Sequence, residues 1–203
     1  MHVITYDFHN PIVQTLVKKD ADLKPLFKAI NPVRYVQWED PFAFMVYTVI
    51  SQQISIAVAD VLYARLIERL DGDLTPHNVL TQTEQSLLEC GLSRAKVVYV
   101  KAVAKAMLDG ILKRAMEPSL SLQEAKGILL KIRGIGPWSV DMFMMFVVGH
   151  EDIFALGDLA LRQALASLKR VDASDLKRLE KIVNAYKPYR SIVAHALWQH
   201  REG

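Results

Sequence analysis

Helix-length apolar segments recur along the chain, and most of them open on a residue that caps helices. The segment 40–53 begins with the capping residue Asp40, and Pro41 takes the first helical position. In SLQEAKGILLKI, Ser121 and Glu124 stand at capping-box spacing before the apolar residues. We therefore predict an all-α fold of about ten helices, with a short strand only in the first few residues. The other predicted helical segments are 55–72, 83–91, 93–110, 121–132, 137–149, 158–170, 174–186 and 188–201.

Composition narrows the class of protein. At 203 residues and 51% hydrophobic, the chain can bury the core of a compact globular protein. The single cysteine, Cys90, excludes a disulfide framework and a four-cysteine iron–sulfur site within the chain, and the six histidines lack ligand-like spacing, so we expect no catalytic metal. There is no signal-peptide pattern, and the longest apolar run, MFMMFVV, is too short to span a bilayer. We expect a cytoplasmic monomer with no membrane partner, whose net charge of +3 permits an anionic partner without requiring one.

An abrupt corner at RGIGPW interrupts the helical pattern. A helix predicted to end at Ile132 is followed by one beginning at Pro137. Only four residues reverse the chain between them, so we expect both Gly134 and Gly136 to take backbone conformations that other residues avoid. Such a turn exposes backbone N–H groups beside a helix N-terminus, where a phosphate fits. We expect Ile135 to anchor this turn in the core.

This corner has two interpretations. Two closely spaced glycines are most often only a tight connection between helices, and the spacing by itself favours that reading. The alternative is a phosphate-binding turn, to which Ser139 adds a hydroxyl group and Arg133 and Lys131 add positive charge. Isolated Lys and Arg side chains on helices are usually only solvated, so these two residues do not decide between the readings.

The residues around the corner do decide, because they resemble the signature of the helix-hairpin-helix DNA glycosylase superfamily. Two further segments, DPFAFMVYTVISQQIS (40–55) and YKPYRSIVAHALW (186–198), are similar to the 3-methyladenine DNA glycosylase II branch of that superfamily. Together the matching segments span residues 40–198. Within LLKIRGIGPWSVDMFMMFVVGHEDIFALGDLALRQAL, the matching positions are Leu129, Ile132, Gly134, Ile135, Gly136, Trp138, Ser139, Phe154 and Asp158.

The resemblance implies a single glycosylase unit, 1–203, built as two helical lobes with a cleft between them. Lobe A would cover 37–148 and include the helix-hairpin-helix at about 121–148. Lobe B would combine 1–36 with 149–203. The implied activity is hydrolysis of the N-glycosidic bond between an alkylated base and deoxyribose in double-stranded DNA. The base must be flipped out of the duplex before the enzyme can reach that bond.

Asp158 is the residue that the resemblance identifies as catalytic. A fixed carboxylate stabilises the oxocarbenium character that the sugar acquires as the bond breaks, and it can orient or deprotonate the attacking water. An aspartate that opens GDLALRQAL is also a good N-cap without any catalytic role. The two roles are compatible, since the helix dipole favours an ionised carboxylate at this end.

Trp138 distinguishes between branches of the superfamily. In members that resemble endonuclease III, a lysine at this position attacks the sugar to form a Schiff base, and tryptophan has no such amine. We therefore predict a monofunctional glycosylase that does not cut the strand. The alternatives are a DNA-binding protein that retains the hairpin without turnover, and a bifunctional glycosylase/lyase for oxidised bases.

The predicted base pocket is aromatic, because a cationic alkylated base is attracted to electron-rich ring faces. Trp138 and Trp198 match aromatic pocket positions of the family, and Phe42 and Tyr47 are candidates for its walls. Aromatic residues at helical spacing are more often core residues, so Phe42 and Tyr47 are open to that simpler reading. Met142 stands where some relatives have tyrosine and would line the pocket with a thioether.

The polar pair in SQQIS implies a second contact with DNA. By resemblance, Gln53 is the wedge that fills the gap left by the flipped base, and Gln52 contacts DNA or the lobe interface. A glutamine satisfied between two helices is a nearly equal alternative. We expect no organic cofactor, although the resemblance allows a monovalent cation at the hairpin carbonyls. In a bacterium, the enzyme would work at the nucleoid.

Overall fold

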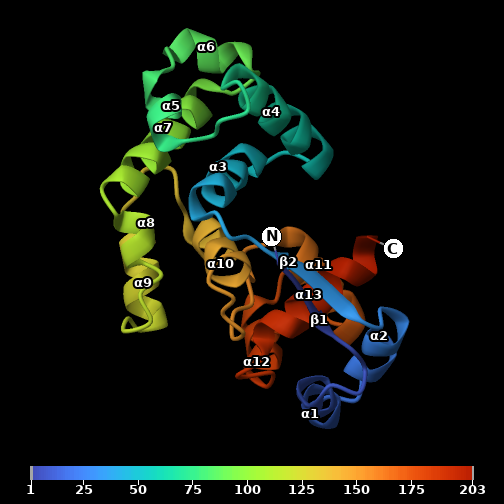
Figure 1. Cartoon of the computed structure of the whole chain (residues 1–203). Helices are drawn as coiled ribbons and strands as arrows, with labels where there is room; N and C mark the ends of the chain where they lie inside the picture. Colours follow the sequence, from blue (N-terminus) through green and yellow to red (C-terminus); the bar gives the residue numbers. More distant parts are fainter. Residues whose placement is uncertain (1, 203) are drawn as a thin grey trace. The chain divides into compact units, whose positions relative to one another are not determined.

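The computed structural model describes residues 2–202, so residues 1 and 203 of the predicted lobe B lie outside it. The described part contains thirteen helices and two short strands, so the predicted all-α class is confirmed apart from a minor sheet. The chain forms two compact units (Figure 1). Unit 1 comprises the residues up to Glu39 together with those from Met144 onward, and unit 2 is Asp40–Phe143.

Unit 1 combines both ends of the described chain. Its strands pair antiparallel, with Ile4 opposite Tyr35, and they lie side by side in Figure 1. Helix α13 packs against β2, α2 and α11, so it lies at the centre of this unit. The elements are β1 (His2–Tyr6), α1 (Pro11–Lys19), α2 (Leu23–Ala29), β2 (Val33–Gln37), α11 (Leu159–Lys169), α12 (Leu176–Asn184) and α13 (Arg190–Glu202).

Strand β2 corrects the prediction that a strand could occur only in the first few residues. The prediction relied on the absence of a hairpin turn, whereas β1 and β2 are separated in sequence by α1 and α2. Val33 is buried, while Arg34 and Val36 are exposed. This alternation over five residues is too short to stand out in the sequence.

Unit 2 is built around α7, which packs against α3, α5, α6 and α8. The predicted caps are confirmed: the Asp40 carboxylate accepts from the Phe42 N–H at 2.8 Å, and Ser121 and Glu124 form a capping box. The last turn of α10 continues into unit 1. The elements are α3 (Pro41–Ser51), α4 (Ile56–Arg69), α5 (Pro76–Thr81), α6 (Glu84–Glu89), α7 (Arg94–Leu108), α8 (Ile111–Arg114), α9 (Leu122–Leu129) and α10 (Pro137–Phe146).

Candidate active site

Asp158 is the N-cap of α11, as the sequence predicts. Its carboxylate oxygen Oδ1 accepts a hydrogen bond from the Leu161 N–H at 2.7 Å. The indole N–H of Trp198, from α13, donates to the same oxygen at 3.5 Å. The side chain is only partly buried. A carboxylate in this setting is held in one orientation by two donors and lies at the positive end of a helix dipole.

The loop that leads to Asp158 is anchored by the first residues of α13. The Arg190 guanidinium binds Asp152 through Nε–Oδ1 at 2.6 Å and Nη2–Oδ2 at 3.1 Å, and it also donates to the Asp152 carbonyl at 2.8 Å. The Ser191 hydroxyl donates to the His150 carbonyl at 2.7 Å and accepts from the Ile153 N–H at 2.9 Å. No role was predicted for Arg190 or Ser191, although the matched segment 186–198 contains both.

Trp198 belongs to an aromatic cluster within unit 1. Its ring lies 6.0 Å from that of Phe146 and 5.8 Å from that of His195. His195 is stacked on Tyr35 at 3.8 Å. Burial lowers the pKa of His195 to about 3, so its imidazole is neutral at physiological pH and serves as a packing group.

The other predicted pocket residues lie in unit 2. Phe42 is 2% exposed and Met142 is 6% exposed, so both are part of its hydrophobic core and present almost no surface to a ligand. Tyr47 is partly buried, and its hydroxyl donates to Asp60 at 2.7 Å. Burial and this hydrogen bond raise the pKa of Tyr47 to about 12. Trp138 is partly buried in the first turn of α10.

The glycine corner differs from the prediction in where its first helix ends. Helix α9 stops at Leu129, not at Ile132. Short-range turns follow, in which the Ile132 N–H donates to the Leu129 carbonyl and the Ile135 N–H donates to the Ile132 carbonyl, each at 3.0 Å. Ile135 is buried, so it anchors the turn in the core as predicted. The connection to Pro137 is therefore a tight hairpin of seven residues, 130–136.

The two hairpin glycines adopt different conformations. Gly134 has a φ of +87°, and a Cβ at this position would lie 2.1 Å from the Tyr99 ring. Gly136 does not have a positive φ, which corrects the expectation for that residue, and a Cβ there would meet open space. The N–H groups of both glycines have no acceptor within residues 2–202. These donors are available to an anion.

Ser139 and Gln52 interact with each other beneath the hairpin. The Gln52 side-chain amide donates to the Gly134 carbonyl at 3.0 Å and to the Ser139 hydroxyl at 3.1 Å. Ser139 is 1% exposed, so its hydroxyl is directed into unit 2 and not to its surface. Gln53 is exposed and has a φ of +59°. The structure therefore places the two glutamines in different environments.

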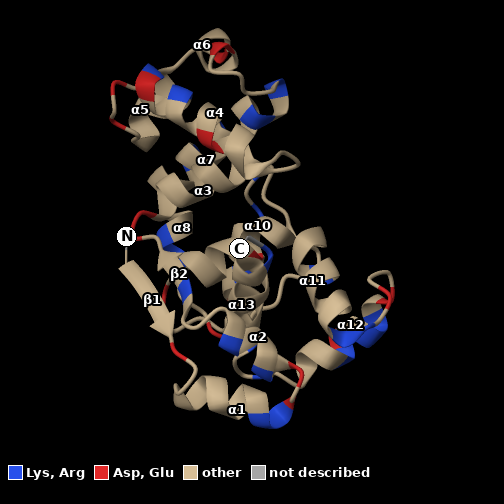
Figure 2. Ribbon diagram, turned by 90° about the vertical axis from the view of Figure 1, so that its right-hand side faces the viewer, with Lys and Arg blue, Asp and Glu red and all other residues tan. Residues whose placement is uncertain are grey.

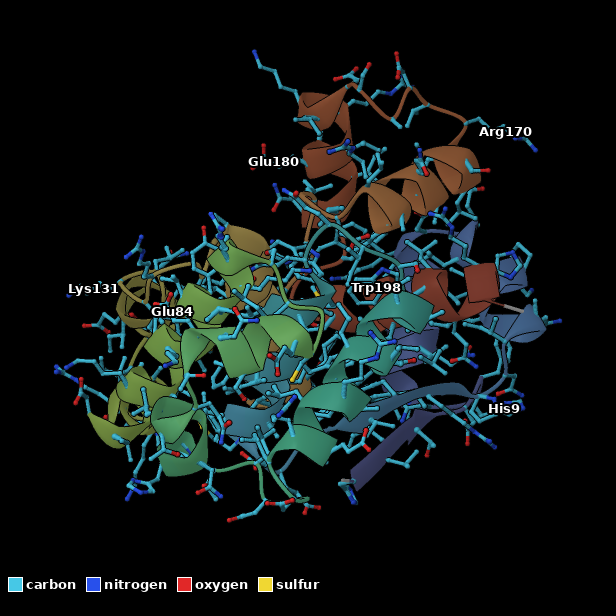
Figure 3. All side chains as sticks on the ribbon, turned by 90° about the horizontal axis from the view of Figure 1, so that it is seen from above. His9, Glu84, Lys131, Arg170, Glu180 and Trp198 are labelled. Carbon is cyan, nitrogen blue, oxygen red and sulfur yellow. The ribbon has the colours of Figure 1, made fainter. Side chains whose placement is uncertain are left out.

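The basic residues near the hairpin divide into free and paired side chains. Lys131 and Arg133 are exposed, and Lys131 extends from the surface of unit 2 in Figure 3. Lys126 forms an ion pair with Asp141 at 2.6 Å. Figure 2 shows Lys and Arg on several helices of both units, so positive charge is not confined to the hairpin. Only Lys131 and Arg133 fit the predicted phosphate contact.

The hairpin carbonyls are where the family resemblance allows a monovalent cation. Within residues 2–202, no three His, Cys, Asp or Glu side chains lie together as a metal site would require. At the hairpin, the Gln52 side-chain amide donates one hydrogen bond to the Gly134 carbonyl. This bond uses one of the two lone pairs of that oxygen, and no step below depends on a cation.

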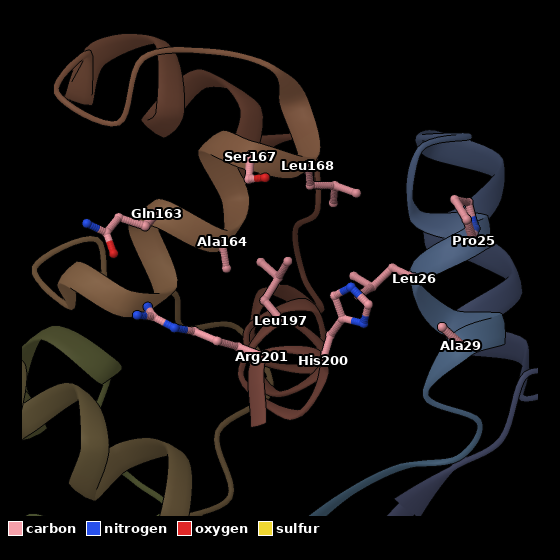
Figure 4. Close-up of a pocket in the computed structure, with 10 residues that line it drawn as sticks. All are labelled: Pro25, Leu26, Ala29, Gln163, Ala164, Ser167, Leu168, Leu197, His200 and Arg201. Carbon is pink, nitrogen blue, oxygen red and sulfur yellow. The ribbon is translucent and has the colours of Figure 1, made fainter. Parts of the chain in front are cut away.

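A hollow of about 530 Å³ lies elsewhere in unit 1, between α2, α11 and α13 (Figure 4). Its walls include Leu26, Ala164 and Leu197, with His200 and Arg201 toward one side. Neither Asp158 nor Trp198 lines it, so it is not the predicted base pocket.

Among residues 2–202, no helix has the length and apolar character needed to cross a membrane.

Comparisons with known proteins agree with the family resemblance. The sequence profile of the HhH-GPD superfamily base excision DNA repair proteins matches residues 46–188. DNA-3-methyladenine glycosylase 1 of Schizosaccharomyces pombe is 27% identical over 187 residues, which cover 89% of this chain and 82% of the relative. The crystal structure of a DNA-3-methyladenine glycosidase from Bacillus halodurans aligns with a TM-score of 0.83 at 26% identity, over 96% of this chain and 91% of the other.

The same fold also occurs with another chemistry. The crystal structure of an 8-oxoguanine glycosylase/lyase from Clostridium acetobutylicum aligns with a TM-score of 0.76 at 20% identity, over 92% of this chain and 69% of the other. At this identity the likeness supports the fold alone, so activity has to be argued from the site. The profile match covers more than half of the chain, and the fold agrees with it. The chain belongs to the HhH-GPD superfamily of base excision DNA repair proteins.

Proposed function

We propose that this chain is a monofunctional DNA glycosylase that releases alkylated bases of the 3-methyladenine and 7-methylguanine type from double-stranded DNA. The observation that carries the proposal is the Asp158 carboxylate, held by the Leu161 N–H and the Trp198 indole N–H in a chain of this superfamily. The names of the relatives supply the class of base. The activity requires no cofactor and would take place where DNA lies, in the cytosol or at a bacterial nucleoid.

The chemistry follows from the charge of the substrate. Alkylation at N3 or N7 makes a purine cationic, which weakens its bond to the sugar and favours contact with aromatic faces such as those of Trp198 and Trp138. As the bond breaks, positive charge passes to the sugar. The fixed carboxylate of Asp158 stabilises that charge and orients the attacking water. Hydrolysis leaves a neutral base and an abasic site.

DNA is held by its backbone in this proposal. The N–H groups of Gly134 and Gly136 bind a phosphate close to the lesion, and the exposed side chains of Lys131 and Arg133 add positive charge. Gln53, at the exposed turn after α3, enters the space left by the flipped base. Phe42 and Met142 contribute to the packing of unit 2, because both are buried.

Asp158→Asn tests the catalytic role. Asn keeps the oxygen that accepts from the Leu161 N–H and caps helices about as well as Asp, so thermal stability should change little. Loss of the charge should reduce the single-turnover rate of base release at least about a hundredfold. The matched control is Asp175→Asn, because Asp175 caps α12 through the Arg178 N–H at 3.0 Å and has no proposed role in chemistry.

The measurement is release of labelled 3-methyladenine and 7-methylguanine from alkylated duplex DNA, at stated salt. Full activity of Asp158→Asn would contradict the role of this carboxylate. Release of no base by the wild-type chain, with retained binding to the duplex, would favour the non-catalytic DNA-binding alternative. Borohydride should trap no covalent adduct, since Trp138 replaces the Schiff-base lysine; a trapped adduct would indicate a glycosylase/lyase.

A further inference from the structure

The loop that carries Gln53 is bonded directly to the glycine hairpin. Gln52 ends α3, and its amide donates to two groups of the hairpin region, the Gly134 carbonyl and the Ser139 hydroxyl. These contacts join positions 82 and 87 residues apart in the sequence. The Gln52 amide therefore fixes the distance between the end of α3 and the hairpin, which are far apart in the sequence.

Helix α7 supports both segments from the same side. The Lys96 ammonium donates to the Ile50 carbonyl at 2.6 Å, near the C-terminal end of α3, and burial lowers the pKa of Lys96. One turn further along α7, the Tyr99 ring lies against Gly134 so closely that only glycine fits. The end of α3 and the hairpin thus rest on neighbouring residues of one helix, and Gln52 connects them above it.

The backbone at Gln53 needs such support. A φ of +59° is uncommon for a residue with a side chain, and the conformation persists only where the surroundings determine it. The hydrogen bonds on either side of it are long: the Gln52 N–H donates to the Val49 carbonyl and the Ile54 N–H to the Ser51 carbonyl, each at 3.4 Å. The two hydrogen bonds of the Gln52 side chain, at 3.0 and 3.1 Å, are shorter than either of these backbone bonds.

We propose that Gln52 is a positioning residue that couples the phosphate-binding hairpin to the Gln53 wedge. This inference rests on the proposed function, because it assumes that Gly134 and Gly136 bind the backbone and that Gln53 enters the duplex. With the phosphate fixed by the hairpin, the Gln52 contacts set how far along and into the duplex Gln53 reaches. Gln52 then acts through the hairpin and Gln53 and has no contact with DNA of its own.

The coupling predicts a selective defect. A wedge lowers the free energy needed to keep a paired base out of the stack, and that help matters less when the base has no partner. In Gln52→Ala, base release from a lesion opposite a normal base should be about tenfold slower, the order expected for one or two lost hydrogen bonds. Release from the same lesion opposite a tetrahydrofuran abasic analogue should stay within about twofold of wild type.

Gln85→Ala is the matched control. It also removes a glutamine side-chain hydrogen bond within unit 2, to Glu89 at 3.3 Å, but on the exposed helix α6. Both duplexes should be processed at the wild-type rate by this variant. Equal slowing of the two duplexes by Gln52→Ala would indicate a general structural defect and would overturn the coupling, as would wild-type rates on both.

Gln52→Glu provides a second test that does not depend on removing the side chain. An ionised carboxylate cannot donate to the Gly134 carbonyl, whereas the protonated carboxyl group can. The rate of Gln52→Glu relative to wild type on the paired lesion should therefore rise as pH falls from about 8 to about 5.5. A ratio that does not change with pH would contradict the hydrogen-bonded role.

Fluorescence of 2-aminopurine separates this inference from the proposed function. The probe, placed opposite the lesion, reports loss of stacking without requiring bond cleavage. If wild type releases no base, the proposed function fails, yet a weaker fluorescence rise with Gln52→Ala than with wild type would still support the coupling. An equal rise in both proteins would overturn it.

Discussion

Gly134 and Gly136 are both part of the hairpin, but the protein needs them for different reasons. A side chain at Gly134 would require a positive φ and would overlap the Tyr99 ring, so glycine is demanded by the fold itself. Nothing in the structure opposes a side chain at Gly136, where φ is ordinary and the space in front is open. We infer that glycine is needed at this position because a DNA phosphate approaches the backbone there, and a side chain would block it.

Three glycine-to-alanine variants separate these roles. Gly134→Ala should destabilise the protein by more than about 2 kcal/mol, because the backbone strain and the overlap with Tyr99 add. Gly136→Ala should keep the wild-type unfolding midpoint and bind duplex DNA about tenfold more weakly, because a methyl group blocks the phosphate. The measurements are thermal unfolding and fluorescence anisotropy with a labelled duplex.

Gly127→Ala is the control for this pair. Gly127 lies within α9, has an ordinary φ, and a Cβ there would meet open space. Alanine should raise stability by roughly 0.5–1 kcal/mol through its better helix propensity and leave DNA affinity unchanged. If Gly136→Ala binds duplex DNA with unchanged affinity, the proposal that the hairpin binds a DNA phosphate is wrong.

How far the sequence predicts a residue's role depends on whether the cause is local. The cap at Asp158 is predicted because it needs only the next three residues. The burial of Ser139 is not, because its partner Gln52 lies 87 residues away in the sequence. The conformation of Gly136 is also missed: two glycines suggest two strained residues, but one positive φ at Gly134 suffices for the turn.

The loop before α11 and the start of α13 form one hydrogen-bonded arrangement. Arg190 and Ser191 bind residues 150–153, and two turns later on α13 the Trp198 indole reaches Asp158. One helix therefore contacts both the base of the loop and the carboxylate that the loop carries.

Arg190→Lys tests this arrangement. Lysine keeps the positive charge but cannot form the forked contact with both oxygens of Asp152 and its carbonyl. The single-turnover rate of base release should fall about three- to tenfold, while the affinity for duplex DNA stays close to wild type. Binding is the discriminating measurement, since general unfolding would reduce both quantities.

Arg69→Lys is the matched control. Arg69 pairs with Glu89 at 3.1 Å, and both side chains are largely exposed, so this ion pair contributes little. Its loss should change neither rate nor stability measurably. A wild-type rate in Arg190→Lys would show that the loop keeps Asp158 in place without the forked contact.

Elements that depend on distant partners or are very short are predicted poorly, and helices α1 and α2 are also absent from the predicted segments. Strand β2 exists because β1 pairs with it and α13 packs on it, and neither partner is adjacent to β2 in the sequence. Helix α8 has only four residues, Ile111–Arg114, too few for a hydrophobic period to be recognised. The long helices with a capping residue and a continuous apolar pattern, such as α4 and α7, are predicted well.

The assignment of the two units as the lobes of a glycosylase stays a prediction. The structure divides the chain at Glu39 and again at Phe143, and the sequence places its boundaries at 36 and 148. The proposed catalytic carboxylate lies in unit 1, and the hairpin lies in unit 2. At the scale of the whole chain, the pH dependence of the free energy of unfolding has an identifiable source, His195.

The folded chain should lose stability in mild acid because of His195. Burial lowers the pKa of His195 from 6.5 to about 3. Between these two values the unfolded chain binds a proton that the folded chain does not, so stability rises with pH and is lost as pH falls below about 6.5. Each pH unit in this window should cost about 1.4 kcal/mol. From about pH 7.5 to about pH 5, this residue alone removes roughly 2 kcal/mol.

His195→Gln isolates this contribution, because glutamine does not titrate. The variant will be less stable at neutral pH, because it loses the stack on Tyr35. The quantity to compare is therefore the slope of the urea midpoint against pH. Between about pH 7.5 and about pH 5, the midpoint should fall less steeply for the variant than for wild type. Parallel curves for wild type and His195→Gln would mean that His195 accepts its proton in the folded state. The imidazole would then lie nearer to water than a side chain with 4% exposure allows.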